Sequence, residues 1–288
     1  MPCEKNVIYL YDGSFEGMLC CVYESVYCRE VPLNILPRDE AAITLFEQRY
    51  VATDEEKAAR VYASIPRRIG SAAAELVRDV FLSCAQEKEM MILLFLLMGY
   101  QTGPRLMRMH GNPALKPLES AQIALKNEVH LLLGFVRFSD YNGTLVAAIS
   151  PKNYVLPYLQ PHFCGRLGRE DFLIYDRVHK AALLNDKDGA RIVTLEKLET
   201  PPASPEEEAY RALWKRFYDT IAIAARANPK CRMTHMPKRY WDNMCEMCPE
   251  LPEAQRPPAL EQARAHAEAA RRALGSAQGN PPGNRAAL

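Results

Sequence analysis

The chain has 288 residues, 48% of them hydrophobic, which is enough for one large domain or two small ones around a buried core. Its 36 Lys and Arg residues nearly balance its 35 Asp and Glu residues, so the formal net charge is only +1. This balance excludes recognition of nucleic acid through overall charge alone. Any such surface must come from local segregation of charged side chains.

No stretch of the sequence indicates a membrane segment. The run from Met90 to Met98 is wholly apolar but far shorter than the roughly 20 residues of a membrane-spanning helix, so it predicts a core helix. Residues Met1 to Tyr11 contain charged side chains and lack the apolar core of a secretory signal. We therefore expect a cytoplasmic protein with no membrane association.

The first half of the chain predicts two strands and a helical part. Apolar residues before Asp12-Gly13-Ser14 indicate a buried strand that ends in a turn, and Ser14 can cap a helix from Phe15 to Cys28. A second strand is expected at Thr44 to Val51. Apolar residues at helical spacing then predict a helical part over residues 54–131.

A hairpin-containing sheet unit is predicted over residues 132–200. Asn142-Gly143 is typical of a type I′ turn and pairs Tyr141 with Thr144. The expected elements are strands at 132–141 and 144–150, a helix at 154–167, and strands at 172–180 and 191–196. They form a strand-strand-helix-strand-strand unit in a small antiparallel sheet. Alternation along the strands places Arg137 and Arg177 on its polar face.

The C-terminal part predicts one long helix followed by a tail. Ser204-Pro205-Glu206-Glu207 is a capping box with proline at the first helical position, and the helix is expected over residues 205–227. Its apolar stripe predicts a face in the core, made of Tyr210, Leu213, Trp214, Phe217, Ile221 and Ala224. Residues 251–288 have the composition of a flexible tail. The fold class is thus α+β, with one domain over residues 1–250.

Candidates for catalysis are few. The sequence contains no hydrolase elbow, phosphate loop, dinucleotide fingerprint or metalloprotease pair. Asp12 at a strand end, His130 and His162 could act in acid–base chemistry. Turn capping by Asp12 and ordinary hydrogen bonding of the two histidines are the alternatives, so whether the chain is an enzyme stays open.

One group of thiol and imidazole side chains has a composition suited to zinc. Cys231, His235, Cys245 and Cys248 would supply four ligands, although their spacing matches no common zinc motif. Free cysteine is also a common small core residue. We therefore expect no cofactor and keep these four residues as candidates only.

Basic and aromatic residues indicate possible nucleic-acid contacts. Arg137, Lys152, Arg166 and Arg177 belong to the hairpin-containing part, and Lys238, Arg239, Tyr240 and Trp241 form a second group. Cations neutralise phosphates, and Tyr and Trp faces can stack on unpaired bases. The alternative is that Tyr240 and Trp241 anchor their segment in the core while the two cations face outward.

Several segments together resemble one bacterial family. They are Tyr11 to Gly17, Gly134 to Phe138, Leu156 to Phe163, Ile174 to Arg177, Asn228-Pro229 and Met236 to Trp241. The chain is similar over about residues 7–246 to a family of unknown function described as DNA metabolism or repair proteins. The resemblance implies association with a radical-SAM protein assigned to DNA repair. In some relatives it implies fusion to a uracil-DNA-glycosylase-like domain.

Three functions follow as hypotheses. The preferred one is an accessory DNA-binding or partner-binding protein of a DNA repair or modification system, in which a radical-SAM partner supplies the redox chemistry. The second is an enzyme that acts on a nucleic-acid base. The third is a scaffold that binds only its protein partner. The sequence does not indicate an oligomeric state.

Overall fold

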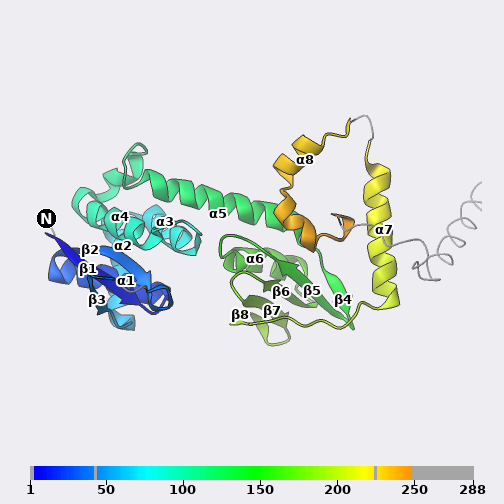
Figure 1. Cartoon of the computed structure of the whole chain (residues 1–288), viewed down its shortest axis with the longest axis horizontal. Coiled ribbons are helices and arrows are strands. Elements are labelled where there is room, and N and C mark those ends of the chain that lie inside the picture. Colours follow the sequence, from blue (N-terminus) through cyan, green and yellow to red (C-terminus); the bar gives the residue numbers. More distant parts are fainter. Residues whose placement is uncertain (1–2, 42–43, 224–225, 248–288) are drawn as a thin grey trace, which may run out of the picture. The chain divides into compact units, whose positions relative to one another are not determined.

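The protein has an α+β fold, as predicted. A computed structural model describes residues 3–41, 44–223 and 226–247 (Figure 1). Contacts divide the chain into two compact units: unit 1 comprises Met1–Gly134 and Pro151–Leu159, and unit 2 comprises Phe135–Ser150 and Gln160–Leu288. Whether both belong to one folding domain over residues 1–250 stays a prediction.

Unit 1 contains a three-stranded parallel sheet in the order β2-β1-β3. Its strands are β1 (Cys3–Tyr11), β2 (Glu30–Pro37) and β3 (Glu47–Tyr50). The helix α1 (Phe15–Cys28) joins β1 to β2 and has the predicted bounds, and Ser14 caps it by accepting from the backbone N–H of Gly17 at 2.9 Å. The parallel arrangement follows from this helical crossover.

Four helices occupy the predicted helical part of unit 1. They are α2 (Glu55–Arg68), α3 (Ser71–Leu82), α4 (Lys88–Thr102) and α5 (Lys116–Phe135). The apolar run in α4 lies in the core as predicted, since Ile92, Phe95 and Leu96 are fully buried. None of the described helices combines the length and the apolar character that crossing a bilayer requires.

Unit 2 contains a five-stranded mixed sheet, which corrects the predicted antiparallel sheet. Its strands lie in chain order as β4 (Ser139–Tyr141), β5 (Thr144–Ile149), β6 (Asp171–Asp176), β7 (Ala181–Asp186) and β8 (Gly189–Thr194). The neighbours β5 and β6 are parallel, and the other pairs are antiparallel. The parallel pair results from the crossover helix α6 (Leu156–Arg166) between β5 and β6.

The hairpin turn was predicted correctly, but strand bounds were not. Tyr141 pairs with Thr144, and Asn142 and Gly143 have φ angles of 55° and 88°. Because α5 continues to Phe135, β4 begins only at Ser139. β6 ends at Asp176, whose carboxylate accepts from the amides of the following turn. Neither Arg137 nor Arg177 lies in a strand, so the predicted shared sheet face is not formed.

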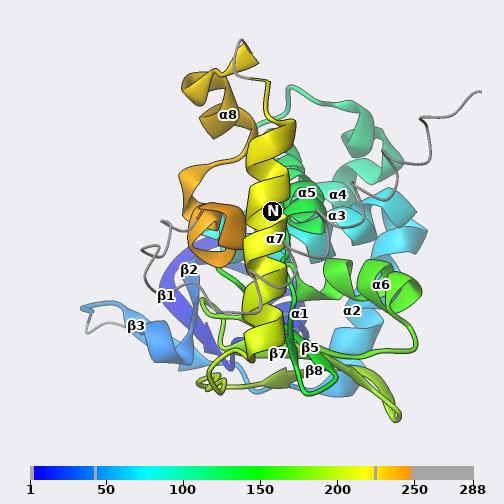
Figure 2. The same ribbon diagram turned by 90° about the vertical axis from the view of Figure 1, so that its right-hand side faces the viewer.

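The C-terminal part of unit 2 is helical. It comprises α7 (Pro205–Ile221), α8 (Pro229–His235) and the 3₁₀ helices η4 (Lys238–Asn243) and η5 (Cys245–Met247) (Figure 2). The side chain of Ser204 accepts from the backbone N–H of Glu207 at 3.2 Å, as the capping box predicts. The helix α7 ends six residues before the predicted bound at 227. The predicted tail at 251–288 lies outside the described residues.

The predicted burial of the α7 stripe is wrong. Exposed fractions are 70% for Tyr210, 62% for Leu213, 41% for Trp214, 50% for Phe217 and 59% for Ile221. Ala224, also predicted in this stripe, lies outside the described residues. Helical spacing of apolar residues indicates that a helix has an apolar face, but it does not indicate what covers that face.

Candidate nucleic-acid interface

The segment from α8 to η4 has local signals that explain its path. The side chain of Asn228 accepts from the backbone N–H of Cys231 at 3.0 Å, and Pro229 occupies the first position of α8. The short helix ends at His235, and Pro237 precedes η4. These caps and prolines hold the residues from Lys238 to Asn243 in one compact turn.

The two aromatic residues of this turn have different environments. Tyr240 is only 2% exposed, and its ring centroid lies 5.6 Å from that of Phe135. Trp241 is half-buried, and its indole N–H donates to the carbonyl of Met236 at 3.0 Å. Tyr240 therefore anchors the segment in unit 2, whereas Trp241 is fixed in position with part of its side chain open to solvent.

Two cations gather around Trp241. The Arg232 guanidinium carbon lies 5.2 Å from the indole centroid, and the Lys238 ammonium nitrogen lies 5.9 Å from it. We call Arg232, Lys238 and Trp241 the Trp241 cluster. Cation–π contacts of this kind contribute about 0.5–1 kcal/mol at exposed sites. The cluster thus combines positive charge and an aromatic surface at one place.

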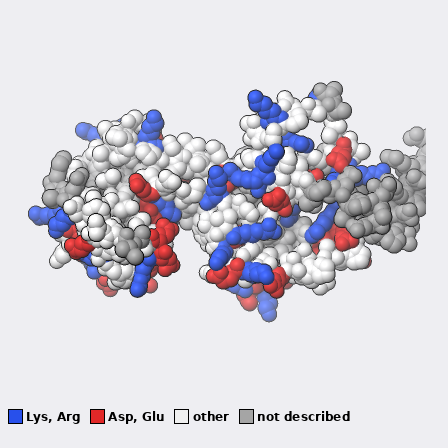
Figure 3. Space-filling model, viewed as in Figure 1, with Lys and Arg blue, Asp and Glu red and all other residues white. Residues whose placement is uncertain are grey.

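The surroundings of the Trp241 cluster are rich in exposed cations. Among the described residues, no carboxylate forms an ion pair with Arg226, Lys230, Arg232 or Lys238. Figure 3 shows Lys and Arg side chains collected over α8 and the segment that follows it. This local excess contrasts with the net charge of +1 for the whole chain.

Arg137 has a different environment from these cations. Its Nε donates to Glu246 Oε1 at 3.0 Å, and its Nη2 donates to the same oxygen at 2.7 Å. The guanidinium also lies 5.5 Å from the ring centroid of Trp214. The carboxylate of Glu246 is buried, so Arg137 neutralises a charge inside unit 2.

Burial by itself raises the pKa of Glu246, but the hydrogen bonds and charge of Arg137, together with hydrogen bonds from the backbone and from Trp214, hold the pKa below its usual value. The ion pair with Arg137 thus both neutralises the buried carboxylate of Glu246 and contributes to its lowered pKa. Arg239, in the same C-terminal segment, lies over Tyr240, with 4.6 Å between the guanidinium carbon and the ring centroid.

The other predicted phosphate contacts are exposed. Arg166 lies at the end of α6, and Arg177 lies in the turn after β6. Lys152 belongs to unit 1, where its side chain is exposed while its backbone N–H donates to Glu128. Their roles in binding stay predictions.

Asp12 is engaged in local structure. Its Oδ1 accepts from the Ser14 amide at 2.9 Å, and its Oδ2 accepts from the Thr53 hydroxyl at 2.7 Å. Burial raises the pKa of Asp12, but these hydrogen bonds together lower it below the ordinary value. A Cβ added at Gly17 would lie 2.3 Å from Oδ1, so the close approach of α1 requires glycine. Turn capping accounts for Asp12 without a substrate.

The two histidines considered for acid–base catalysis are exposed. His130 lies on α5, and His162 lies on α6 with its ring centroid 5.0 Å from that of Phe163. A histidine that the sequence analysis did not select has a carboxylate partner instead. His179 Nδ1 lies 2.6 Å from Asp176 Oδ2, and Asp176 is fully buried. The sequence did contain signals for this pair, because Asp176 belongs to the motif Ile174 to Arg177 and His179 follows it three positions later.

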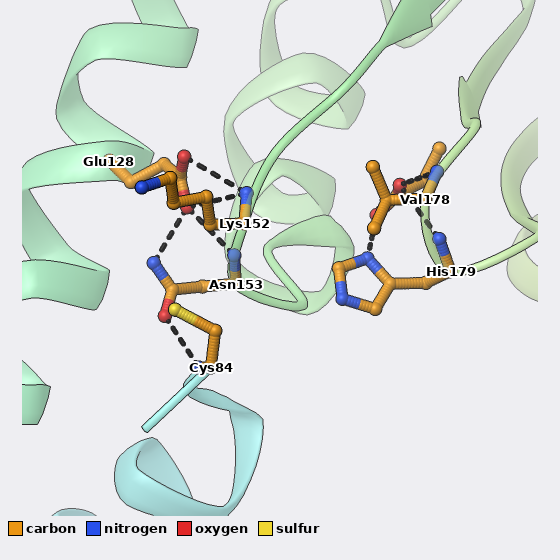
Figure 4. Close-up of polar contacts among 7 residues, drawn as sticks. Cys84, Glu128, Lys152, Asn153, Val178 and His179 are labelled. Carbon is orange, nitrogen blue, oxygen red and sulfur yellow. Dashed lines mark hydrogen bonds and ion pairs between the residues drawn. The ribbon is translucent and has the colours of Figure 1, made fainter. Parts of the chain in front are cut away.

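A buried carboxylate in unit 1 was also missed. Glu128 accepts from the backbone N–H groups of Lys152 at 3.1 Å and Asn153 at 2.8 Å, and from the Asn153 side chain at 2.6 Å. The Asn153 side-chain oxygen in turn accepts from the backbone N–H of Cys84 at 2.9 Å (Figure 4). This arrangement satisfies the amides of residues 152–153 and holds them against α5.

The candidate metal ligands that can be placed do not form a site. Cys231 and His235 are exposed on α8, and Cys245 is half-buried beside Glu246. Burial, followed by the charge of Glu246, raises the pKa of the Cys245 thiol, which disfavours the thiolate that zinc requires. Cys248 lies outside the described residues. No group of three potential metal ligands is found within residues 3–41, 44–223 and 226–247.

A family model described as a domain of unknown function, DUF4130, matches residues 86–246. The match includes α4, α5, the mixed sheet, α7 and the Trp241 cluster, and it excludes the parallel sheet of unit 1. No curated protein matches the chain.

Proposed function

The chain belongs to the DUF4130 family, and on that premise we propose that it is an accessory nucleic-acid-binding protein of a DNA repair or modification system. The observation that carries the proposal is the Trp241 cluster, in which a half-buried indole is held beside two exposed cations. The resemblance of the sequence to DNA metabolism proteins supports DNA as the ligand. Such a protein would work in the cytoplasm.

Nucleic acid matches the chemistry of the cluster. The cations neutralise phosphates and release counterions, which makes binding sensitive to salt. The exposed part of Trp241 offers an aromatic surface on which one base can stack, and such stacking contributes about 1–3 kcal/mol. The bond from its indole N–H to Met236 fixes the ring beforehand. Because bases in a duplex are already stacked on one another, we expect single-stranded or locally unpaired DNA to bind best.

We propose that the chain supplies recognition and that a partner supplies chemistry. The resemblance supports a radical-SAM protein as this partner. A pull-down of the full chain with that protein, in the presence and absence of single-stranded DNA, tests the association. Retention of the partner only when DNA is present would mean that DNA bridges the two proteins.

Binding of a fluorescent single strand, measured by anisotropy over a range of salt concentrations, tests the proposal directly. We expect affinity to fall steeply with salt and to fall further when Arg232→Ala and Lys238→Ala are combined. Trp241→Ala should lose about 5- to 150-fold in affinity for the single strand, as expected for one stacked base. Arg60→Ala with Arg105→Ala removes two exposed cations of unit 1 and is the matched control.

Two outcomes would contradict the proposal. Equal loss of affinity in the Arg60 and Arg105 control would mean that binding follows total charge and not the cluster. Absence of binding at low salt would favour the scaffold hypothesis, in which the chain binds protein only.

A second candidate function is an enzyme that acts on a nucleic-acid base. The short contact between His179 and the buried Asp176 favours it, because a carboxylate that holds Nδ1 orients an imidazole for proton transfer. Incubation with uracil-containing or damaged DNA should then yield abasic or altered products, and His179→Gln should abolish them. Product formation that persists in His179→Gln would exclude this residue as the base.

A further inference from the structure

One short segment of unit 2 contacts the chain on both sides of Trp241. This segment, Phe135 to Arg137, connects the end of α5 to β4. Before Trp241, the ring of Phe135 lies 5.6 Å from the ring of the buried Tyr240. After Trp241, Arg137 forms its ion pair with the buried Glu246 at 2.7 Å. Tyr240 and Glu246 are only six positions apart, so both contacts hold the same short stretch of chain.

The ion pair restrains this stretch in direction as well as in distance. Nε and Nη2 of Arg137 both donate to Glu246 Oε1, and Nη1 of Arg137 donates to the carbonyl of Val136 at 3.2 Å. Loss of either partner is strongly unfavourable, because the carboxylate is buried. The contact of Asn243 Nδ2 with Ser150 Oγ in the same stretch is long at 3.4 Å and restrains the chain less.

The position of the indole depends on this attachment. The indole N–H of Trp241 donates to the carbonyl of Met236, which precedes η4 in the same segment. This bond fixes the ring relative to its own segment only. The contacts of Tyr240 and Glu246 fix the segment relative to the rest of unit 2. The place at which the indole meets a ligand therefore follows from these contacts.

We propose that Arg137 is a positioning residue of the nucleic-acid site and does not itself contact the nucleic acid. By its pairing with Glu246, it holds η5 and the preceding η4, and it thereby fixes where Trp241 meets an unpaired base. This inference rests on the proposed function, because it concerns the site that the Trp241 cluster forms. It also replaces the role of phosphate contact that the sequence predicted for Arg137.

Two substitutions with opposite effects on charge separate positioning from contact. Arg137→Gln removes a cation and Glu246→Gln removes an anion, but both remove the same ion pair. We expect both to weaken single-strand binding several-fold in anisotropy titrations, although loss of an anion alone should strengthen it. Tighter binding by Glu246→Gln would overturn the proposal. Arg191→Gln is the matched control, because it removes an ion pair with Asp186 elsewhere in unit 2.

A double-mutant cycle shows whether Arg137 acts through the indole. In the Trp241→Ala protein, a further Arg137→Gln substitution should reduce affinity much less than it does in the wild-type protein. The log–log salt slope should stay unchanged in Arg137→Gln, since no phosphate contact is lost. Additive losses, or a slope that is smaller by about 0.7, would make Arg137 a direct phosphate contact and overturn the proposal.

A measurement without nucleic acid separates this inference from the proposed function. The chain has two tryptophans, so fluorine NMR of protein labelled with 5-fluorotryptophan gives two signals, and Trp214→Phe assigns them. We expect Arg137→Gln to shift or broaden the Trp241 signal and Arg191→Gln to leave it unchanged, with circular dichroism as the check on folding. An unchanged Trp241 signal in Arg137→Gln would overturn the positioning role. A shifted signal in a protein that binds no single strand would contradict the proposed function alone.

Discussion

The helices α4 and α7 are both rich in large apolar residues, but most of those on α4 lie in the core, whereas those of the α7 stripe are exposed. Phe95 of α4 is fully buried, whereas Phe217 of α7 is 50% exposed. Core contacts surround α4 within unit 1, while α7 is attached to unit 2 by polar contacts of Glu207 and Arg211 and by the contact of Trp214 with Arg137. An apolar stripe on a helix therefore indicates that the stripe is normally covered, but the molecule that covers it can be a part of the same chain or another molecule.

The largest expected effect separates the two phenylalanines. Phe95→Ala should lower the free energy of unfolding by about 3–5 kcal/mol, because it leaves a cavity in a closely packed core. Phe217→Ala should change it by less than about 1 kcal/mol in dilute protein. Urea unfolding followed by circular dichroism measures both. A similar loss in both variants would mean that α7 is packed in the monomer, which breaks the comparison.

A smaller effect is expected for charged residues of unit 1 and of α7. Glu128→Ala leaves two backbone amides and the Asn153 side chain without their acceptor, and should cost about 2–3 kcal/mol in the free energy of unfolding. Glu208→Ala on α7 is the control, since Glu208 is exposed and should change stability by about 0.5 kcal/mol or less. Equal stabilities of the two variants would show that Glu128 does not hold residues 152–153.

The pH dependence of the free energy of unfolding tests the contact between Glu246 and Arg137 in unit 2. The folded-state pKa of Glu246 lies below its ordinary value of 4.5, so its contribution to stability is present above pH 4.5 and is lost as pH falls through the folded pKa. We expect a modest effect, because Arg137 retains partial exposure. Unfolding measured between pH 7 and pH 3 should show a weaker decline in Glu246→Gln. An unchanged decline would assign the acid sensitivity to other carboxylates.

The smallest effect on stability is expected at the Trp241 cluster. Lys238→Ala should change the free energy of unfolding by about 0.5 kcal/mol or less, because this cation is exposed. The same substitution should reduce the log–log salt slope of single-strand binding by about 0.7, the value for one phosphate contact. Anisotropy titrations measure the slope, and Arg60→Ala is the control. A large loss of stability with an unchanged slope would make Lys238 a structural residue.

Local signals predicted much of the fold. Ser14 and Ser204 cap their helices as expected, and Asn142-Gly143 forms the expected turn, because each signal involves residues close in sequence. The strand β2 was missed because Pro32 and Pro37 interrupt its pattern, although prolines are tolerated on an edge strand. The parallel pairing of β5 and β6 results from the helix α6 between them, and the residue pattern within each strand does not indicate it.

The candidate site was predicted less well than the fold. Charge and aromatic content drew attention to residues 236–241, but only the structure separates the buried Tyr240 from the half-buried Trp241. Arg137 was expected on an open surface because its partner, Glu246, lies 109 positions away. Residues that meet only through tertiary contacts, such as this pair, carry no local signal.

The discontinuous composition of unit 1 has a consequence for synthesis on the ribosome. Residues 135–150, which include β4 and β5, emerge before the segment Pro151–Leu159 that completes unit 1. The strand β6, which pairs with β5, is translated after that segment. The hairpin of β4 and β5 therefore has an open strand edge while unit 1 finishes folding. The ion pair between Arg137 and Glu246 forms later still, since Glu246 is among the last described residues to be translated. Slow translation between residues 150 and 171 would therefore prolong the stage at which this strand edge is open to pairing with another chain.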